Sequence, residues 1–442
     1  MALVDHAQEW LTKVAADCAA QEQPFACASR PADPVQTLYW GAHRFGPDTL
    51  ASMHAEARSA FKRYAADPSD LAEALDIAEP ALAARVHRRV AQKLDREPIE
   101  DIRLDFEDGY GKREDPEEDA HADACGRAVL AAHVAGTLPR RYGIRIKALT
   151  AELGTRSLRT LERFVLAAGG REMPPGFVVT LPKVTVVAQV EAITDLLGAL
   201  ETDVGLPPGS IGLEFMLEVP QAVFDGQGRL LLPRLLAAGG ERLLGIHLGV
   251  YDYTAAHEIV ALHQAMDHPA CDLIRGLMRM AYSGSGRTLS AGSTNVLPRE
   301  PHPIAATQAH VEENRAAVHG GWRLAHDQIR HTLVRGYYHG WDLDPLQLPA
   351  RYAACYRFYL EGHAAAAGRL SSYIAQATAA TEGAGVLDDV ATGQALLNIF
   401  VRGRACGAFD AQEVAAAGVS DADLDDGSFA RLLARRSAAG GA

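Results

Sequence analysis

Cysteine is scarce in this chain, and no two cysteines are spaced as a pair. The 442 residues include six cysteines, at Cys18, Cys27, Cys125, Cys271, Cys355 and Cys406. Structural zinc sites and disulfide-rich scaffolds both depend on closely spaced cysteines, so the sequence argues against both. The scarcity fits a reducing compartment, and we expect a cytoplasmic protein.

A surplus of positive charge and long apolar runs are also lacking. The chain has 43 Lys and Arg against 56 Asp and Glu, a formal net charge of −13. Any anionic ligand must therefore be bound by a local basic cluster. No apolar run approaches the roughly 20 residues that cross a bilayer. Asp5, His6 and Glu9 interrupt the stretch where a secretory signal is continuously apolar. We expect neither nucleic acid nor a membrane among the partners.

The sequence is rich in short apolar segments that alternate with longer segments of helical period. This alternation is typical of repeated βα units. Eight segments predict strands, at 36–41, 101–106, 143–148, 176–182, 211–218, 243–249, 288–290 and 340–343. One predicted helix carries an apolar stripe at spacings of four and three, made of Val186, Val190, Ile193, Leu197 and Leu200.

Repeated right-handed crossovers between eight strands predict a closed (β/α)₈ barrel, the TIM-barrel fold of the α/β class. An open doubly wound sheet is the alternative, because the last two predicted strands are short. We expect an N-terminal arm over 1–32, the catalytic barrel over 33–348 and a helical region over 349–442. Residues 48–96 exceed the length of one crossover and predict a helical insertion after the first strand.

Polar side chains lie at the ends of several predicted strands, where barrel enzymes carry their active sites. They are Asp105, Glu107 and Asp108 at the second strand, Arg145 and Lys147 on the third, Lys183 after the fourth, Glu218 on the fifth and Asp252 after the sixth.

Glu218 and Asp252 predict a metal site. Neighbouring strands would bring the two carboxylates together, and they repel each other unless a cation lies between them. Carboxylate oxygens completed by water and substrate are typical ligands of Mg²⁺. A structural ion pair between Glu218 and a Lys or Arg is an equally acceptable interpretation.

Three further residues are candidates for binding substrate. The planar fork of Arg145 fits a carboxylate or enolate oxygen, or else a pairing with a carboxylate of the second strand. Lys183 fits an anion clamp or, with a pKa lowered by burial, a Schiff base. His43 follows the first strand, where it fits a substrate contact or a general base, although a surface histidine is the simpler interpretation.

The Gly- and Ser-rich stretch 283–295 contains Arg287 and offers backbone N–H groups for a phosphate or carboxylate. It lacks the spacing of a P-loop. A flexible loop that closes over the barrel mouth would bring Arg287 to the substrate, although a loop without a binding role is the simpler interpretation.

Several of these segments, taken in order, resemble motifs of the citrate lyase β-subunit, malyl-CoA lyase and HpcH/HpaI aldolase family, and more distantly malate synthase. The segments are RLDFEDGYG (103–111), RIKA (145–148), LPKV (181–184), LEVPQAV (217–223), LGVYDYTA (248–255) and the closing GWDLDPLQL (340–348). The order of these motifs is far more specific than any one of them.

The resemblance implies a carbon–carbon lyase that uses Mg²⁺ and acts through a metal-stabilised enolate on a small 2-oxo or hydroxy carboxylic acid or its CoA thioester. It assigns Mg²⁺ to Glu218 and Asp252 and a substrate oxygen to Arg145, and it places Lys183 near the substrate. Glu107 and Asp108 receive supporting catalytic roles. We also expect a homo-oligomer.

This sequence departs from the family pattern in places. Asp344 stands where the family usually has His, and Gln221 and Ala222 replace the usual residues after the metal-ligand Glu. The first strand lacks the family's R-S-x-L-F-x-P-G segment, which helps to hold CoA, so use of a thioester is open.

Other functions also fit the sequence. Phosphoenolpyruvate-type phosphoryl transfer would place Arg287 against phosphate, although no catalytic histidine on a mobile domain is evident. A barrel that binds a small acid without turnover is the non-enzymatic alternative. The general base is not identified. His43, a metal-bound water, the C-terminal helices and a neighbouring subunit are all open.

Overall fold

The computed structural model describes residues 3–22, 33–380 and 390–440, and at its centre lies one parallel sheet. The sheet has eight strands in the order β7-β6-β5-β4-β3-β2-β1-β8. Its two edges meet where a parallel bridge joins Ser290 to His339 and the N–H of Ala291 donates to the His339 carbonyl at 2.9 Å. The nearly closed barrel confirms the predicted (β/α)₈ fold, and the open sheet is excluded.

The predicted strands are all present, with ends that differ by a few residues. The strands are β1 (Gln36–Gly41), β2 (Asp101–Asp105), β3 (Arg141–Arg145), β4 (Phe177–Leu181), β5 (Gly212–Leu217), β6 (Leu243–Leu248), β7 (Thr288–Ser290) and β8 (Gly340–Asp342). The largest difference is at β3, because its apolar run continues beyond the paired residues: the N–H of Ile146 still donates to the Thr180 carbonyl at 3.2 Å.

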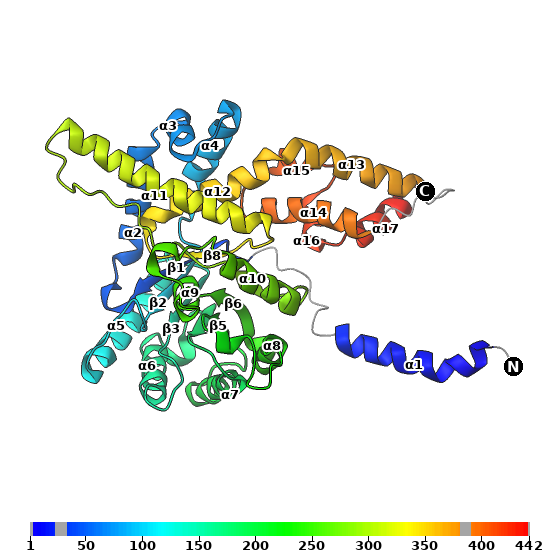
Figure 1. Cartoon of the computed structure of the whole chain (residues 1–442), viewed down its shortest axis with the longest axis horizontal. Coiled ribbons are helices and arrows are strands. Elements are labelled where there is room, and N and C mark those ends of the chain that lie inside the picture. Colours follow the sequence, from blue (N-terminus) through cyan, green and yellow to red (C-terminus); the bar gives the residue numbers. More distant parts are fainter. Residues whose placement is uncertain (1–2, 23–32, 381–389, 441–442) are drawn as a thin grey trace.

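Helices on the outside of the barrel connect β2 to β7 (Figure 1). They are α5 (Asp115–Val134), α6 (Gly154–Ala167), α7 (Val187–Val204), α8 (Leu232–Gly239), α9 (Val250–Ala256) and α10 (Pro269–Tyr282). Val190, Ile193 and Leu197 of α7 are fully buried, which confirms the centre of the predicted stripe. Val186 precedes the helix and is exposed.

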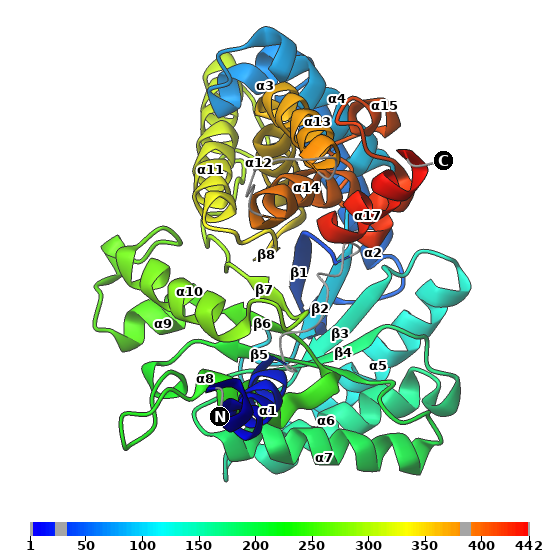
Figure 2. The same ribbon diagram turned by 90° about the vertical axis from the view of Figure 1, so that its right-hand side faces the viewer.

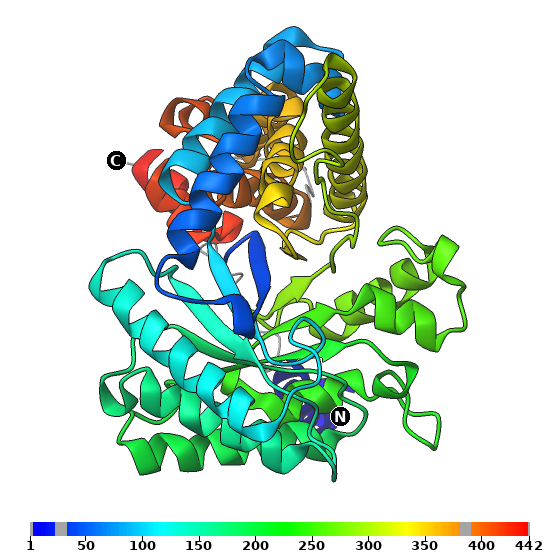
Figure 3. The ribbon, with the colours of Figure 1, turned by 90° about the vertical axis from the view of Figure 1, so that its left-hand side faces the viewer.

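The insertion after β1 holds α2 (Thr49–Tyr64), α3 (Pro68–Leu75) and α4 (Pro80–Arg96). These helices pack with α11 (Gln308–Val334) and α12 (Leu348–Glu361). Together with the C-terminal helices they form a lobe to one side of the barrel (Figures 2 and 3). The C-terminal helices are α13 (His363–Ala380), α14 (Val390–Ala405), α15 (Ala411–Ala415), α16 (Asp421–Asp426) and α17 (Phe429–Gly440).

The N-terminal arm contains α1 (Leu3–Glu22), which stands away from the barrel in Figure 1. Its residues 11–20 are all exposed. Residues 23–32 of the arm, with Cys27, lie outside the described residues. The other cysteines carry free thiols, and all of them except Cys18 are buried. Within the described ranges, no helix has the length and apolarity needed to cross a membrane.

The interior of the barrel is filled by ionic side chains as well as apolar ones. Arg103 is fully buried and pairs with Asp101 and, at 2.8 Å, with Glu214. The hydroxyl of Thr37 donates to Asp101 at 3.1 Å. Towards the carboxyl ends of the strands, Tyr39, Met216 and Trp341 form an apolar layer. Inside the barrel, a layer of ion pairs is therefore followed by an apolar layer. The inward-facing positions beyond the apolar layer lie at the mouth of the barrel.

Candidate active site

An acidic cluster of Glu107, Asp108, Glu218 and Asp252 surrounds the ammonium group of Lys183 at the carboxyl ends of the strands. Lys183 Nζ lies 2.7 Å from Asp252 Oδ2 and 3.3 Å from both Glu107 Oε1 and Asp108 Oδ2. Glu218 Oε1 is 3.9 Å away. The structure thus brings together the side chains that the motifs after β2, β4, β5 and β6 predicted.

The LPKV turn holds Lys183 in an uncommon backbone conformation. Its φ of 52° lies in the left-handed region, which costs an L-residue other than glycine about 1–2 kcal/mol. In this conformation the backbone N–H of Lys183 donates to Glu218 Oε1 at 2.6 Å while the side chain turns to Asp252. Both ends of the residue therefore bind carboxylates of the cluster.

Glu218 is the most deeply buried carboxylate of the cluster, 0% exposed. Its Oε2 atom is buried and accepts no hydrogen bond within the described part of the chain. Burial raises the pKa of Glu218 to about 8, and nearby Lys183 and Arg145 oppose that rise. A buried carboxylate oxygen without a donor is costly, so a further cation would be bound favourably here.

The rest of the cluster is open to solvent on one side. Asp252, in the first turn of α9, is 44% exposed at its side chain. Glu107 is more enclosed, and burial raises its pKa to about 7 against the effect of Arg145. The N–H of Asp108 donates to Glu107 Oε2 at 2.9 Å. Solvent therefore reaches the carboxylate of Asp252.

The electrostatics disfavour a Schiff base at Lys183. Burial alone would lower the pKa of Lys183, but Glu218, Asp252 and Glu107 outweigh it and raise this pKa above its usual value. A charged ammonium has no lone pair for attack on a carbonyl. The raised pKa of Lys183 therefore disfavours the imine alternative from the sequence.

Of the two interpretations of Arg145, the structure shows the pairing with a carboxylate of the second strand, because Asp105 occupies the Nε/Nη2 fork; a substrate contact stays a prediction. Arg145 Nε and Nη2 donate to the two oxygens of Asp105 at 2.7 and 2.5 Å, and Arg145 is 5% exposed. Its Nη1 lies 3.4 Å from Glu107 Oε2 and 3.4 Å from Met216 Sδ. Arg145 Nη1 is therefore the nitrogen of this side chain that lies beside the acidic cluster.

Asp105 has a larger structural role than its sequence position suggested. Besides Arg145 it accepts the backbone N–H groups of Glu107 and Gly109, at 3.0 and 2.6 Å. It therefore shapes the FEDG turn that presents Glu107 and Asp108. The D-x-E-D-G pattern, with a glycine four residues after the strand-end Asp, is the signal that could have identified this anchor.

His43 and Lys147 lie outside the acidic cluster. The His43 ring packs edge-on against Tyr110, with centroids 5.7 Å apart, and burial together with Arg113 lowers its pKa. Lys147 donates to the Phe106 carbonyl and pairs with Glu118, both at 2.7 Å. Substrate binding by His43 stays a prediction.

Arg287 lies at the opposite end of the barrel, so its predicted place at the mouth is wrong. It precedes β7, and its guanidinium donates to the carbonyls of Ser285 at 3.0 Å and Gly240 at 2.8 Å. The stretch 283–295 is not one loop, because β7 divides it. Residues 283–287 belong to the amino end of the barrel and 291–295 to the carboxyl end.

Asp344 stands where the resembled family usually has His. It pairs with Arg299 and accepts a hydrogen bond from the N–H of Leu346.

A family model described as "Domain of unknown function (DUF6986)" matches residues 14–432. The chain belongs to this family. A citrate lyase from Burkholderia xenovorans LB400 shares the fold, with a TM-score of 0.53 and 18% identity over 75% of this chain and 92% of that chain. The predicted resemblance is thus confirmed for the fold.

Malate synthase from Haloferax volcanii shows a weaker likeness. Its magnesium/glyoxylate complex has a TM-score of 0.46 and 15% identity over 74% of this chain and 76% of that chain. Its lead(II) complex has a TM-score of 0.42 and 18% identity over 62% and 68%. No curated protein matches the chain. Similarity this low carries no argument about function.

The residues present fit a divalent cation that is held by two carboxylates rather than by a complete protein cage. In the described ranges, no three His, Cys, Asp or Glu side chains are arranged to hold a metal ion by themselves. Lys183 Nζ occupies the space between the carboxylates. The unpartnered Oε2 of Glu218 is the atom that a further cation would satisfy. Mg²⁺ at Glu218 and Asp252 stays a prediction.

Proposed function

We propose that this chain is a magnesium-dependent carbon–carbon lyase or aldolase that acts on a small 2-oxo or hydroxy carboxylic acid. The observation that carries the proposal is the fully buried Glu218, whose Oε2 has no donor among the described residues, inside the acidic cluster at the barrel mouth. The order of the motifs and the fold shared with a citrate lyase support the reaction class.

In this proposal the carboxylates divide into two pairs. Glu218 and Asp252 would hold Mg²⁺, which when bound polarises a carbonyl oxygen and stabilises negative charge on it. Glu107 and Asp108 remain for proton transfer. Arg145 Nη1 and Lys183 Nζ lie on either side of Glu107, at 3.4 and 3.3 Å, and attract the substrate carboxylate. Arg145 keeps its position through Asp105.

The decisive experiment follows the methyl protons of pyruvate by NMR in D₂O. We expect exchange with Mg²⁺ present and none in EDTA, because formation of an enolate releases these protons whatever the true reaction partner is. Exchange that is insensitive to EDTA, or a borohydride-trapped adduct on Lys183, would contradict the proposal. Binding of Mg²⁺ and pyruvate without exchange would favour the non-enzymatic barrel.

A matched pair of variants separates the cluster from general charge effects. Asp252→Asn removes a proposed ligand, so we expect exchange to fall by about 10²–10³, the range seen when one stabilising group is lost. Glu191→Gln changes an exposed carboxylate on α7 and should leave exchange unchanged. If the two variants changed exchange equally, Asp252 would have no specific role in the site.

The alternative of phosphoryl transfer loses its main support. Arg287, the residue expected to meet phosphate, lies at the opposite end of the barrel from the acidic cluster. The homo-oligomer stays a prediction, and light scattering on a size-exclusion column tests it.

A further inference from the structure

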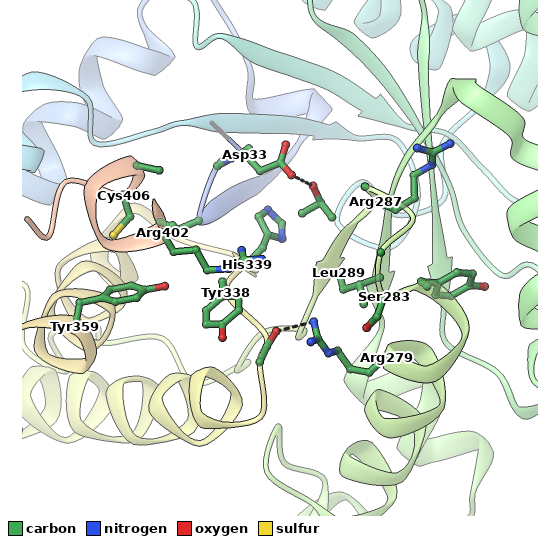
Figure 4. A pocket seen from close by; sticks show the side chains of 18 residues that line it. Asp33, Arg279, Ser283, Arg287, Leu289, Tyr338, His339, Tyr359, Arg402 and Cys406 are labelled. Atoms are coloured by element: carbon green, nitrogen blue, oxygen red, sulfur yellow. Dashed lines mark hydrogen bonds between the residues drawn. The ribbon is translucent and has the colours of Figure 1, made fainter. Parts of the chain in front are cut away.

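A cavity of about 190 Å³ lies at the amino ends of the strands, between the barrel and the C-terminal helices (Figure 4). We call it the basal cavity and define it by Arg279, Tyr282, Arg287, His339 and Arg402. Arg279 and Tyr282 come from α10, Arg402 from α14. The cavity is therefore built by parts of the chain that are far apart in sequence, and it is remote from the acidic cluster.

Basic side chains outnumber acidic ones in the lining. Among the described residues that line the cavity, three are arginines and one, Asp33, is acidic. Asp33 is already bound by Arg141 at 2.6 Å and by the Thr288 hydroxyl at 2.8 Å. Arg279 donates to the Gly336 carbonyl at 3.1 Å. In a chain with a net charge of −13, this is a local cluster of the kind an anion needs.

Two polar side chains of the lining are buried without a partner within the described part of the chain. The hydroxyl of Tyr282, a residue 1% exposed, has no hydrogen bond, and the same holds for Nδ1 of His339, a residue 6% exposed. In Figure 4 the His339 ring faces the cavity. A ligand in the cavity that pairs with such a group would remove the cost of leaving it buried without a hydrogen bond.

The hydrogen bonds around His339 define what its free nitrogen can do. The Thr37 hydroxyl donates to Asp101, so its oxygen is left to accept a hydrogen bond from His339 Nε2, 3.0 Å away. With the proton on Nε2, Nδ1 of a neutral ring is an acceptor. The cavity therefore combines arginine donors for an oxyanion with one acceptor for a hydroxyl group.

We propose that the basal cavity binds a small anion of the phosphate class that carries a hydroxyl hydrogen. The guanidinium groups of Arg279 and Arg402 would bind the charged oxygens, and His339 Nδ1 would accept a hydrogen bond from the hydroxyl. The volume is below that of pockets for drug-sized ligands, about 300–1,000 Å³, and above the roughly 150 Å³ that holds benzene, so one small molecule fits. This proposal does not depend on the one for the mouth.

Calorimetric titration with inorganic phosphate at constant ionic strength, in EDTA, tests the proposal. EDTA prevents binding through a metal at the mouth. We expect saturable binding of phosphate and at least tenfold weaker binding of sulfate, which has the same shape but carries no hydrogen at neutral pH. In thermal melts, phosphate should raise the melting temperature more than sulfate does. Equal binding of the two anions, or no saturation, would overturn the proposal.

Variants locate the bound anion. Arg279→Gln should weaken phosphate binding at least tenfold. Arg404→Gln, an exposed change on the same helix as Arg402, should not alter it. Tyr282→Phe should leave the melting temperature without phosphate unchanged or higher, because the lost hydroxyl had no partner, and should weaken binding. Phosphate binding that survives both cavity changes, or that disappears in Glu218→Gln, would overturn the assignment.

Discussion

The two ends of the barrel carry opposite charge. The mouth gathers carboxylates around Lys183, and three arginines line the basal cavity. In a (β/α)₈ barrel the helices begin near the mouth and end near the base, so their dipoles favour acidic groups at the first and basic groups at the second. Asp252 lies in the first turn of α9, and Arg279 lies in the last turn of α10. The net charge of a chain says little about either site.

Between the two ends of the barrel, the buried ion pairs of Arg103 with Asp101 and Glu214 hold the strands together. Arg103→Met should lower the free energy of unfolding by about 3–5 kcal/mol, because Asp101 and Glu214 would stay buried without their cation. Urea denaturation measures this loss. Arg159→Met, an exposed control, should change stability far less. A loss at Arg103 below about 1 kcal/mol would mean that the interior tolerates unpaired carboxylates.

Glu218→Gln tests whether the mouth is built for function at the expense of stability. We expect exchange of pyruvate protons to fall by about 10²–10³. In EDTA the melting temperature should stay equal or rise, since a buried carboxylate with an unpartnered oxygen is removed. Melts with and without Mg²⁺ decide this. A large loss of stability in EDTA would instead make Glu218 a structural partner of Lys183.

Gly249→Ala should disturb the mouth sterically. A Cβ atom there would lie 2.6 Å from both Cβ and Oε2 of Glu218, so the carboxylate must move. Overpacking of this kind costs about 1–3 kcal/mol, and Mg²⁺ affinity should fall with it. Titration calorimetry and melts measure both effects. Gly276→Ala, in α10 with open space around it, should have the opposite sign and stabilise by about 1 kcal/mol.

Acidification should lower the free energy of unfolding through His339, which lies at the amino ends of the strands. Burial lowers the pKa of His339 well below its usual value, and Glu214, which faces it, only partly opposes the effect of His247, Arg351 and Arg141. The folded ring stays neutral while the unfolded ring takes up a proton below about pH 6.5. The free energy of unfolding should therefore fall with acidification, by up to about 1.4 kcal/mol per pH unit from this group.

Urea denaturation between pH 7 and pH 5 measures that slope. His339→Gln should flatten it, and His133→Gln, at an exposed position, should not. An unchanged slope in His339→Gln would assign the acid sensitivity to other groups.

Sequence reasoning worked where a residue's position along a strand decides its place. The inward-pointing Glu218 and the strand-end Lys183 and Asp252 came together as their motifs predicted, because parallel strands share one carboxyl edge. It failed for Arg287, because the stretch 283–295 was treated as one loop at the mouth, although residues before β7 lie at the amino end of the barrel. For Arg145 it left two partners open, a substrate oxygen or a carboxylate of the second strand, and the structure shows the pairing with Asp105 at 2.7 Å.

The sequence by itself determined the eight strands, the α/β class and the set of carboxylates that end the strands, since hydrophobic periodicity and the position of a residue along a strand are local properties. Closure of the sheet into a barrel was decided by the tertiary structure. Only the tertiary structure decided which donors each carboxylate keeps, the unpartnered oxygen of Glu218 and the basal cavity with its three arginines. These depend on distances between elements such as α10 and α14, which lie more than a hundred residues apart and meet only when the chain is folded.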